Sequence, residues 1–79
     1  MTMEELRAIL VECAGPTEEL AGDLADAEFA ALGVDSLAVI ETAARIRQRL
    51  GVVVPDAVVA DLRSPAELLA AVNAARAAG

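Results

Sequence analysis

The sequence predicts an all-α protein, folded as a small antiparallel four-helix bundle with three main helices and a short third helix. Its 79 residues are dominated by strong helix formers such as Ala, Leu, Glu and Arg. Apolar residues recur at helical spacing in segments that begin and end with capping residues. The one stretch that could be a strand, residues 51–55, has no second strand to pair with.

The first helix is predicted over residues 3–14. Thr2 is a suitable N-cap, and Glu5 completes a capping box with it. Gly15 and then Pro16 end the helix, because neither residue continues it easily. The apolar residues expected on its buried stripe are Leu6, Ile9, Leu10 and Cys13.

Residues 16–34 are predicted to form a long acidic loop between the first two helices. Loops of this length are uncommon in compact domains and are often functional. A short helical turn is expected around residues 26–31. Four apolar side chains should hold the loop over the helices: Leu20, Leu24, Phe29 and Leu32.

The second helix is predicted to start at Asp35 or Ser36 and to end at Leu50, with Asp35 as its cap and Gly51 as its stop. It carries two apolar stripes. One consists of Val39, Ala43, Ile46 and Leu50, and the other of Leu37, Ile40 and Ala44. We expect one stripe to face the core and the other to stay partly exposed for a partner.

The last part of the chain is predicted to hold a short helix and a longer one. After the extended link, residues 56–62 should form one or two helical turns. Ser64 is expected to cap the last helix, with Pro65 in its first position and Glu67 closing a capping box. The residues expected to face inward are Leu68, Leu69, Val72 and Ala75.

Composition excludes several classes of protein. A mass of 8.1 kDa limits residues 1–79 to one domain. One Cys and no His or Lys argue against a disulfide, a zinc site and a catalytic centre, so no metal ligand and no catalytic residue is predicted. A net charge of −7 argues against nucleic acid as a partner. The chain has no apolar run long enough for a membrane span or a signal peptide, and we expect a cytoplasmic monomer.

Residues 29–37 carry the clearest chemical signal. They place Ser36 in the first turn of a helix, after an acid and a bend at Gly33. A phosphate on Ser36 would be stabilised there by free amide donors and by the helix dipole. Asp35 can cap the helix and lies close enough to help hold Mg²⁺ during phosphoryl transfer. The alternative interpretation is that this segment is only a helix cap.

The wider sequence resembles the acyl carrier proteins. The similarity rests on Leu-Gly-x-Asp-Ser-Leu at residues 32–37, on Phe29 and Glu41 around it, on Pro55-Asp56, and on Ser-Pro-x-Glu-Leu-Leu at residues 64–69. It implies a carrier and not an enzyme. By this resemblance Ser36 is joined by a transferase, with coenzyme A and Mg²⁺, to a 4′-phosphopantetheine arm whose thiol holds acyl groups as thioesters.

Residues 10–15, 35–38 and 41–46, together with Asn73, look like the free-standing carriers of bacterial type II polyketide synthases. The resemblance implies four kinds of partner besides the transferase: ketosynthase, malonyl acyltransferase, ketoreductase and cyclase. One departure is the second helix, where Arg45, Arg47 and Arg49 outnumber Glu41. An acidic helix that docks on basic partners cannot simply be carried over to this chain.

These interpretations assign the candidate site residues. Leu37, Ile40, Glu41 and Ala44 are predicted to contact partners, and Val39, Ala43, Ile46, Leu69 and Asn73 to line an acyl cavity. Several alternatives stay open: Asn73 could face solvent or bond to the backbone, and Glu41 could pair with Arg45. Cys13 is expected to be a small core residue, and Arg63 to be solvated. Alternative functions are a fatty-acid-type or other carrier domain and a helical interaction module without a prosthetic group.

Overall fold

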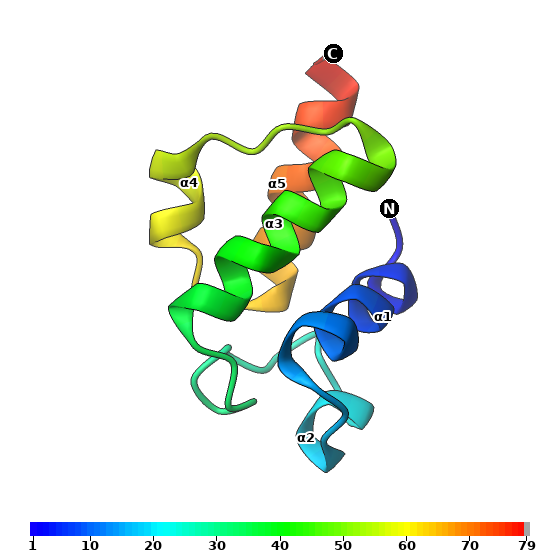
Figure 1. Cartoon of the computed structure of the whole chain (residues 1–79), viewed down its shortest axis with the longest axis vertical. Coiled ribbons are helices and arrows are strands. Elements are labelled where there is room, and N and C mark those ends of the chain that lie inside the picture. Colours follow the sequence, from blue (N-terminus) through cyan, green and yellow to red (C-terminus); the bar gives the residue numbers. More distant parts are fainter. Residues whose placement is uncertain (79) are drawn as a thin grey trace.

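A computed structural model describes residues 1–78 and confirms the all-α prediction (Figure 1). Its helices are α1 (Met3–Ala14), α2 (Glu18–Ala21), α3 (Ser36–Leu50), α4 (Asp56–Asp61) and α5 (Pro65–Ala78). The α1 helix packs against both α3 and α5 and runs in the opposite direction to them, while α4 packs against α3. Residues 1–78 contain no β-strand. No helix in this range is long and apolar enough to cross a bilayer.

The predicted caps of α1 and α3 form as expected. Thr2 Oγ1 accepts a hydrogen bond from the Glu5 amide at 3.2 Å, and the Thr2 amide donates to Glu5 Oε1 at 2.8 Å. At the start of α3, Asp35 Oδ1 accepts from the Ala38 amide at 2.8 Å. Gly51 ends α3 at a φ of 68°, in the left-handed region that favours glycine. Local sequence therefore sets these three helix ends.

The long loop differs from the prediction in two ways. It contains the extra helix α2, capped by Thr17, whose hydroxyl accepts from the Leu20 amide at 3.1 Å. The expected turn at residues 26–31 forms instead over residues 28–33. A hydrogen bond to the segment before α5 sets the position of this turn: the Phe29 amide donates to the Arg63 carbonyl at 2.7 Å. That bond joins segments far apart in the sequence, and so local patterns do not reveal it.

The guanidinium of Arg7 fastens the loop to α1. It donates to the carbonyl oxygens of Leu20 and, at 2.7 Å, of Gly22, and it also pairs with Glu4. These carbonyls lie at the end of α2, where no intrahelical donor remains for them. Arg7 therefore supplies a C-terminal cap from another helix.

We predict that Arg7→Ala lowers the free energy of unfolding by about 1–3 kcal/mol, because charged hydrogen bonds to α2 are lost. Urea denaturation followed by circular dichroism measures this change. Arg76→Ala, an exposed change on α5, is the matched control and should move the midpoint much less. Equal midpoints for the two variants would contradict the role given to Arg7.

The core lies between α1, α3 and α5, under the long loop. Its wholly or almost wholly buried side chains are Leu6, Leu10, Leu20, Leu24, Ile46, Leu68 and Val72. One polar residue, Thr42, is also fully buried, and its hydroxyl donates to the Ala38 carbonyl at 2.7 Å. That bond satisfies the hydroxyl within its own helix, so its burial leaves no polar group unpaired. Cys13, expected in the core, is a free thiol that is only half-buried and packs against the core from its edge.

The start of α5 shows one difference from the predicted capping box. Ser64 Oγ accepts from the Glu67 amide at 3.2 Å, which confirms the cap. The Glu67 carboxylate, however, accepts from the Arg63 amide at 2.8 Å rather than from the Ser64 amide. Of the residues predicted to face inward, Leu68 and Val72 are fully buried. Leu69 and Ala75 are half-buried against the core.

Candidate functional site

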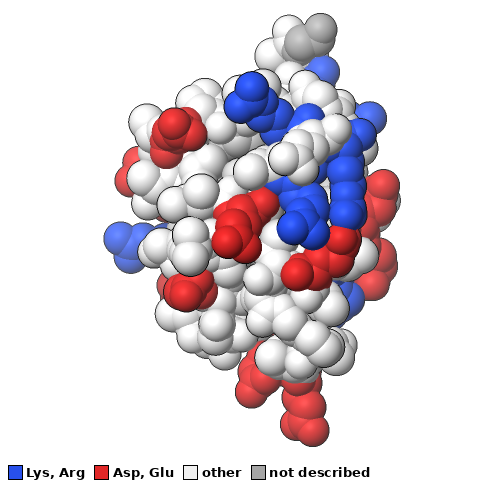
Figure 2. All heavy atoms as spheres, in the orientation of Figure 1, with Lys and Arg blue, Asp and Glu red and all other residues white. Residues whose placement is uncertain are grey.

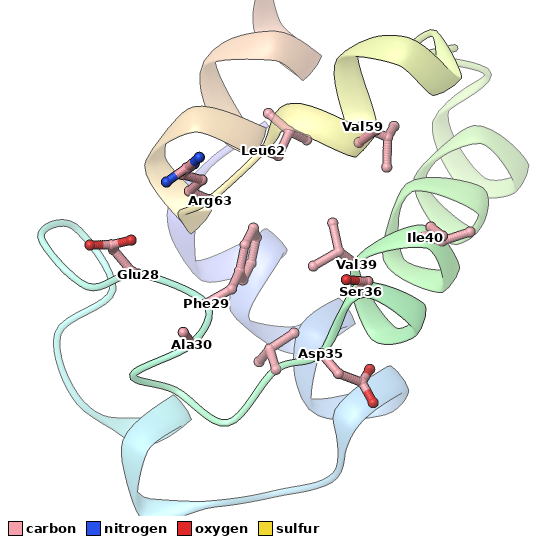
Figure 3. Close-up of a pocket in the computed structure, with 12 residues that line it drawn as sticks. Glu28, Phe29, Ala30, Asp35, Ser36, Val39, Ile40, Val59, Leu62 and Arg63 are labelled. Carbon is pink, nitrogen blue, oxygen red and sulfur yellow. The ribbon is translucent and has the colours of Figure 1, made fainter.

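Ser36 is the first residue of α3 and is exposed. The bend before it is made by Gly33 at a φ of 73°, where a side chain would be strained. Phe29 and Val34 are buried on either side of this bend and hold it against the core. The Asp35 carboxylate is engaged in capping and points away from the hollow beside Ser36 (Figure 3). The local sequence thus presents one hydroxyl at a positive helix end.

Beside Ser36 lies an open hollow of about 590 Å³. Val39 from α3 and Phe29 from the loop point into it, opposite Val59 from α4 (Figure 3). Other lining residues are Glu28, Ala30, Val34, Asp35, Ile40, Ala60, Leu62 and Arg63. The walls are mainly apolar, and the charged groups lie along the rim. Such a hollow suits an apolar ligand with a polar group at its mouth.

A second hollow of about 360 Å³ continues along the groove between α3 and α4. Ile40, Val59 and Ala60 line both hollows and so form the boundary between them. The second hollow is completed by Ala43, Ala44, Arg47, Val53, Val54 and Asp56. The two together extend from Ser36 along about three turns of α3.

Two of the five predicted cavity residues line these hollows, namely Val39 in the first and Ala43 in the second. Ile46 is fully buried in the core, and Leu69 packs half-buried against it. Asn73 is exposed, and its side-chain amide bonds to the first residue. Its Oδ1 accepts from the Met1 amine at 2.8 Å, and its Nδ2 donates to the Met1 carbonyl at 3.1 Å. Both alternatives to the cavity therefore hold for Asn73, which is exposed and bonds to the backbone of Met1.

Sequence reasoning missed the far wall of the first hollow. Val59, Leu62 and Arg63 line it from α4 and the segment after it. The expectation that Arg63 is simply solvated was incomplete, since this exposed residue also lines the rim. No local pattern marks these positions. They reach the site because the Phe29 amide bonds to the Arg63 carbonyl.

The outer face of α3 is apolar next to Ser36. Leu37 is 63% exposed and Ile40 is 55% exposed, and Ala44 is exposed on the next turn. This confirms that the second stripe faces outward. In the other stripe Val39 and Ile46 are buried, but Leu50 is exposed, because α3 extends past the core at that end. Glu41 is exposed and lines a third, smaller hollow with Cys13, Asp35 and Leu37.

The positive charge of α3 is divided between its two sides. Arg45 donates to Glu12 of α1 at 3.2 Å, and Arg49 makes two further bonds to the same carboxylate. The Arg49 hydrogen bonds hold the pKa of Glu12 below its usual value. The predicted alternative pairing of Arg45 with Glu41 is therefore replaced by a bond to α1. Arg47 lies on the other side and lines the second hollow.

Acidic side chains gather at the end of the molecule that carries α2, whereas Arg and acidic side chains lie next to one another over its middle (Figure 2). No group of three or more potential metal ligands occurs in the part of the chain that the structure describes. The site consequently combines one exposed hydroxyl, an apolar groove and scattered charges. These features suit covalent attachment of a group to the hydroxyl.

Comparison with known proteins agrees with this geometry. Residues 4–72 match the family model described as "Phosphopantetheine attachment site". The chain is 48% identical to the actinorhodin polyketide synthase acyl carrier protein of Streptomyces coelicolor, over 95% of this chain and 90% of that one. It is 41% identical to the oxytetracycline polyketide synthase acyl carrier protein of Streptomyces rimosus, over 94% and 80% of the two chains.

Solved structures agree as well. The actinorhodin holo acyl carrier protein of Streptomyces coelicolor superimposes with a TM-score of 0.86 at 46% identity, covering 100% of this chain and 94% of that one. The similarity spans almost the whole chain and favours a carrier over an interaction module without a prosthetic group. The chain therefore belongs to the acyl carrier proteins of type II polyketide synthases, which hold their intermediates on a covalently attached 4′-phosphopantetheine arm.

Proposed function

We propose that Ser36 is the attachment residue for the arm and that residues 1–79 act as one carrier domain. The observation that carries this proposal is an exposed serine at the start of α3, opening onto an apolar hollow. The positive end of a 15-residue helix favours a phosphodiester on that hydroxyl. Asp35 supports the site by capping α3, and its charge can help to hold Mg²⁺ while the transferase acts. When bound, the arm supplies a thiol that holds acyl groups as thioesters.

The direct test is to locate the added mass. Apo protein is incubated with a broad-specificity phosphopantetheinyl transferase, coenzyme A and Mg²⁺, then digested, and each fragment is weighed and sequenced by tandem mass spectrometry. We expect one phosphopantetheinyl group on the fragment that contains Ser36. The chain has one other serine, Ser64, which provides an internal comparison. Modification of Ser64, or of neither residue, would reject the proposal.

We further propose that the hollow beside Ser36 shelters the apolar part of the cargo. Val39, Ile40 and Val59 would contact it, and Ala43 would contact a longer chain. Solved relatives include a malonyl form of the actinorhodin acyl carrier protein and a 3-oxo-butyl form that mimics an intermediate. By analogy, the cargo here would range from short acidic groups to growing chains that carry keto groups.

The proposed partners are a phosphopantetheinyl transferase, a ketosynthase, a malonyl acyltransferase, a ketoreductase and a cyclase, all acting on a cytoplasmic monomer. They would bind the outer face of α3 through Leu37, Ile40, Glu41 and Ala44, which all are exposed around Ser36. A small patch of this kind suits weak binding, which lets the carrier leave each enzyme. This face does not favour nucleic acid, because its side chains are apolar except for the negatively charged Glu41.

Leu37→Ala tests this docking face. We expect it to lower kcat/KM for the transferase about tenfold, since exposed apolar anchors near an interface centre commonly contribute more than 1 kcal/mol. Its stability should barely change, because Leu37 is already 63% exposed. Leu50→Ala is the matched control, an exposed leucine at the far end of the same helix. If the two variants reacted equally fast, Leu37 would not be a docking residue.

A further inference from the structure

Arg47 stands apart from the other arginines of α3. Arg45 and Arg49 bond to Glu12 of α1, whereas Arg47 faces the opposite side and lines the second hollow. The other walls of this hollow are apolar except for Asp56. A concave apolar site with a few polar groups is typical of small-ligand binding rather than of a flat protein contact. Arg47 is therefore positioned to contact a small group that enters the hollow, such as the cargo.

The second hollow lies within reach of a group attached to Ser36. The two hollows share Ile40, Val59 and Ala60, so they form one groove with Ser36 at one end and Arg47 at the other. The helix rises about 16 Å over the eleven residues from Ser36 to Arg47, at about 1.5 Å per residue. An extended phosphopantetheine arm has about thirteen bonds from phosphorus to sulfur and spans about 15 Å. The lengths match.

We propose that Arg47 binds the free carboxylate of a dicarboxylic, malonyl-type thioester carried on the arm. This inference rests on the proposed attachment at Ser36. A guanidinium can donate two parallel hydrogen bonds to a carboxylate, and Arg47 is exposed at the edge of the hollow, where such a group can reach it. An acetyl thioester has no such carboxylate and gains nothing from Arg47. The far end of the groove thus distinguishes acidic cargo from neutral cargo of similar size.

Asp56 opposes this binding. It lies on the same rim as Arg47, in the first turn of α4, and its carboxylate repels a second carboxylate nearby. Removing its charge should strengthen the interaction, and removing the charge of Arg47 should abolish it. The two substitutions are therefore expected to act in opposite directions on malonyl cargo and to leave acetyl cargo unaffected.

The test loads the holo protein with malonyl or acetyl groups and checks each load by intact mass. Methyl NMR signals of Ala43 and Ala44, which line the second hollow, then report whether the cargo reaches it. In the wild type we expect these signals to differ between the two loads. Arg47→Gln should remove the difference, Arg47→Lys should keep part of it, and Asp56→Asn should raise the bound population about two- to fivefold, as for an exposed charge pair. Arg76→Gln on α5 is the neutral control.

Each outcome separates this inference from the proposed function. Failure of the apo protein to gain the arm on Ser36, when the holo protein is prepared, would reject the proposed function and the inference with it. Normal loading with identical Ala43 and Ala44 signals for both cargoes would reject only the inference. If Arg47→Gln left the NMR difference intact but slowed transfer of both cargoes by a ketosynthase equally, Arg47 would be a contact for the partner protein, and the inference would again be rejected.

Discussion

Replacing Ser36 by Ala should abolish the gain of mass with the transferase and coenzyme A, while leaving the helix content unchanged. The variant lacks the hydroxyl that we propose as the attachment point. Its fold should persist, because Asp35 and not Ser36 caps α3 and because Ser36 is exposed. Alanine also has the highest helix propensity. Intact mass spectrometry measures the loading, and circular dichroism measures the fold.

Ser64→Ala is the matched control for this prediction. It removes the only other serine and the cap of α5, so it should lower the free energy of unfolding by about 1 kcal/mol. Its loading should stay complete. Loading of Ser36→Ala would place the attachment elsewhere, and loss of loading in Ser64→Ala, with the fold intact, would show that the reaction depends on more than the Ser36 hydroxyl.

Leu68→Ala should be the most damaging change to stability. Leu68 is fully buried on α5, and truncation of a buried leucine commonly costs about 2–5 kcal/mol. A domain of this length has a total stability of about 4–12 kcal/mol, at about 0.05–0.15 kcal/mol per residue. The variant would therefore lose a large part of it. Urea denaturation should show a much lower midpoint.

The neighbouring Leu69 offers the comparison for Leu68. It has the same side chain on the same helix but is only half-buried. Leu69→Ala should therefore cost clearly less, since the cost grows with the apolar area and the cavity left behind. Equal losses for the two variants would mean that Leu69 contributes as much to the core as Leu68.

The helix ends and the candidate attachment site could be predicted from sequence because their causes are local. Each cause acts within four residues of the chain: Thr2 pairs with Glu5, Asp35 caps the Ala38 amide, and Gly51 ends the helix just before it. The position of Ser36 follows from the same rules, since a capping acid and a glycine bend precede it. The two stripes of α3 could also be separated, because helical periodicity puts Leu37 and Ile40 on a different side from Val39 and Ile46.

Only the tertiary structure decided which groups share a surface. The bond from Phe29 to Arg63, the capping of α2 by Arg7 and the pairing of Arg45 and Arg49 with Glu12 all join segments more than ten residues apart. Such contacts depend on how helices pack, and periodicity within one helix carries no information about its neighbour. For this reason the sequence determined the longer helices and the exposed serine, while packing determined the groove beside Ser36 and the isolation of Arg47 within it.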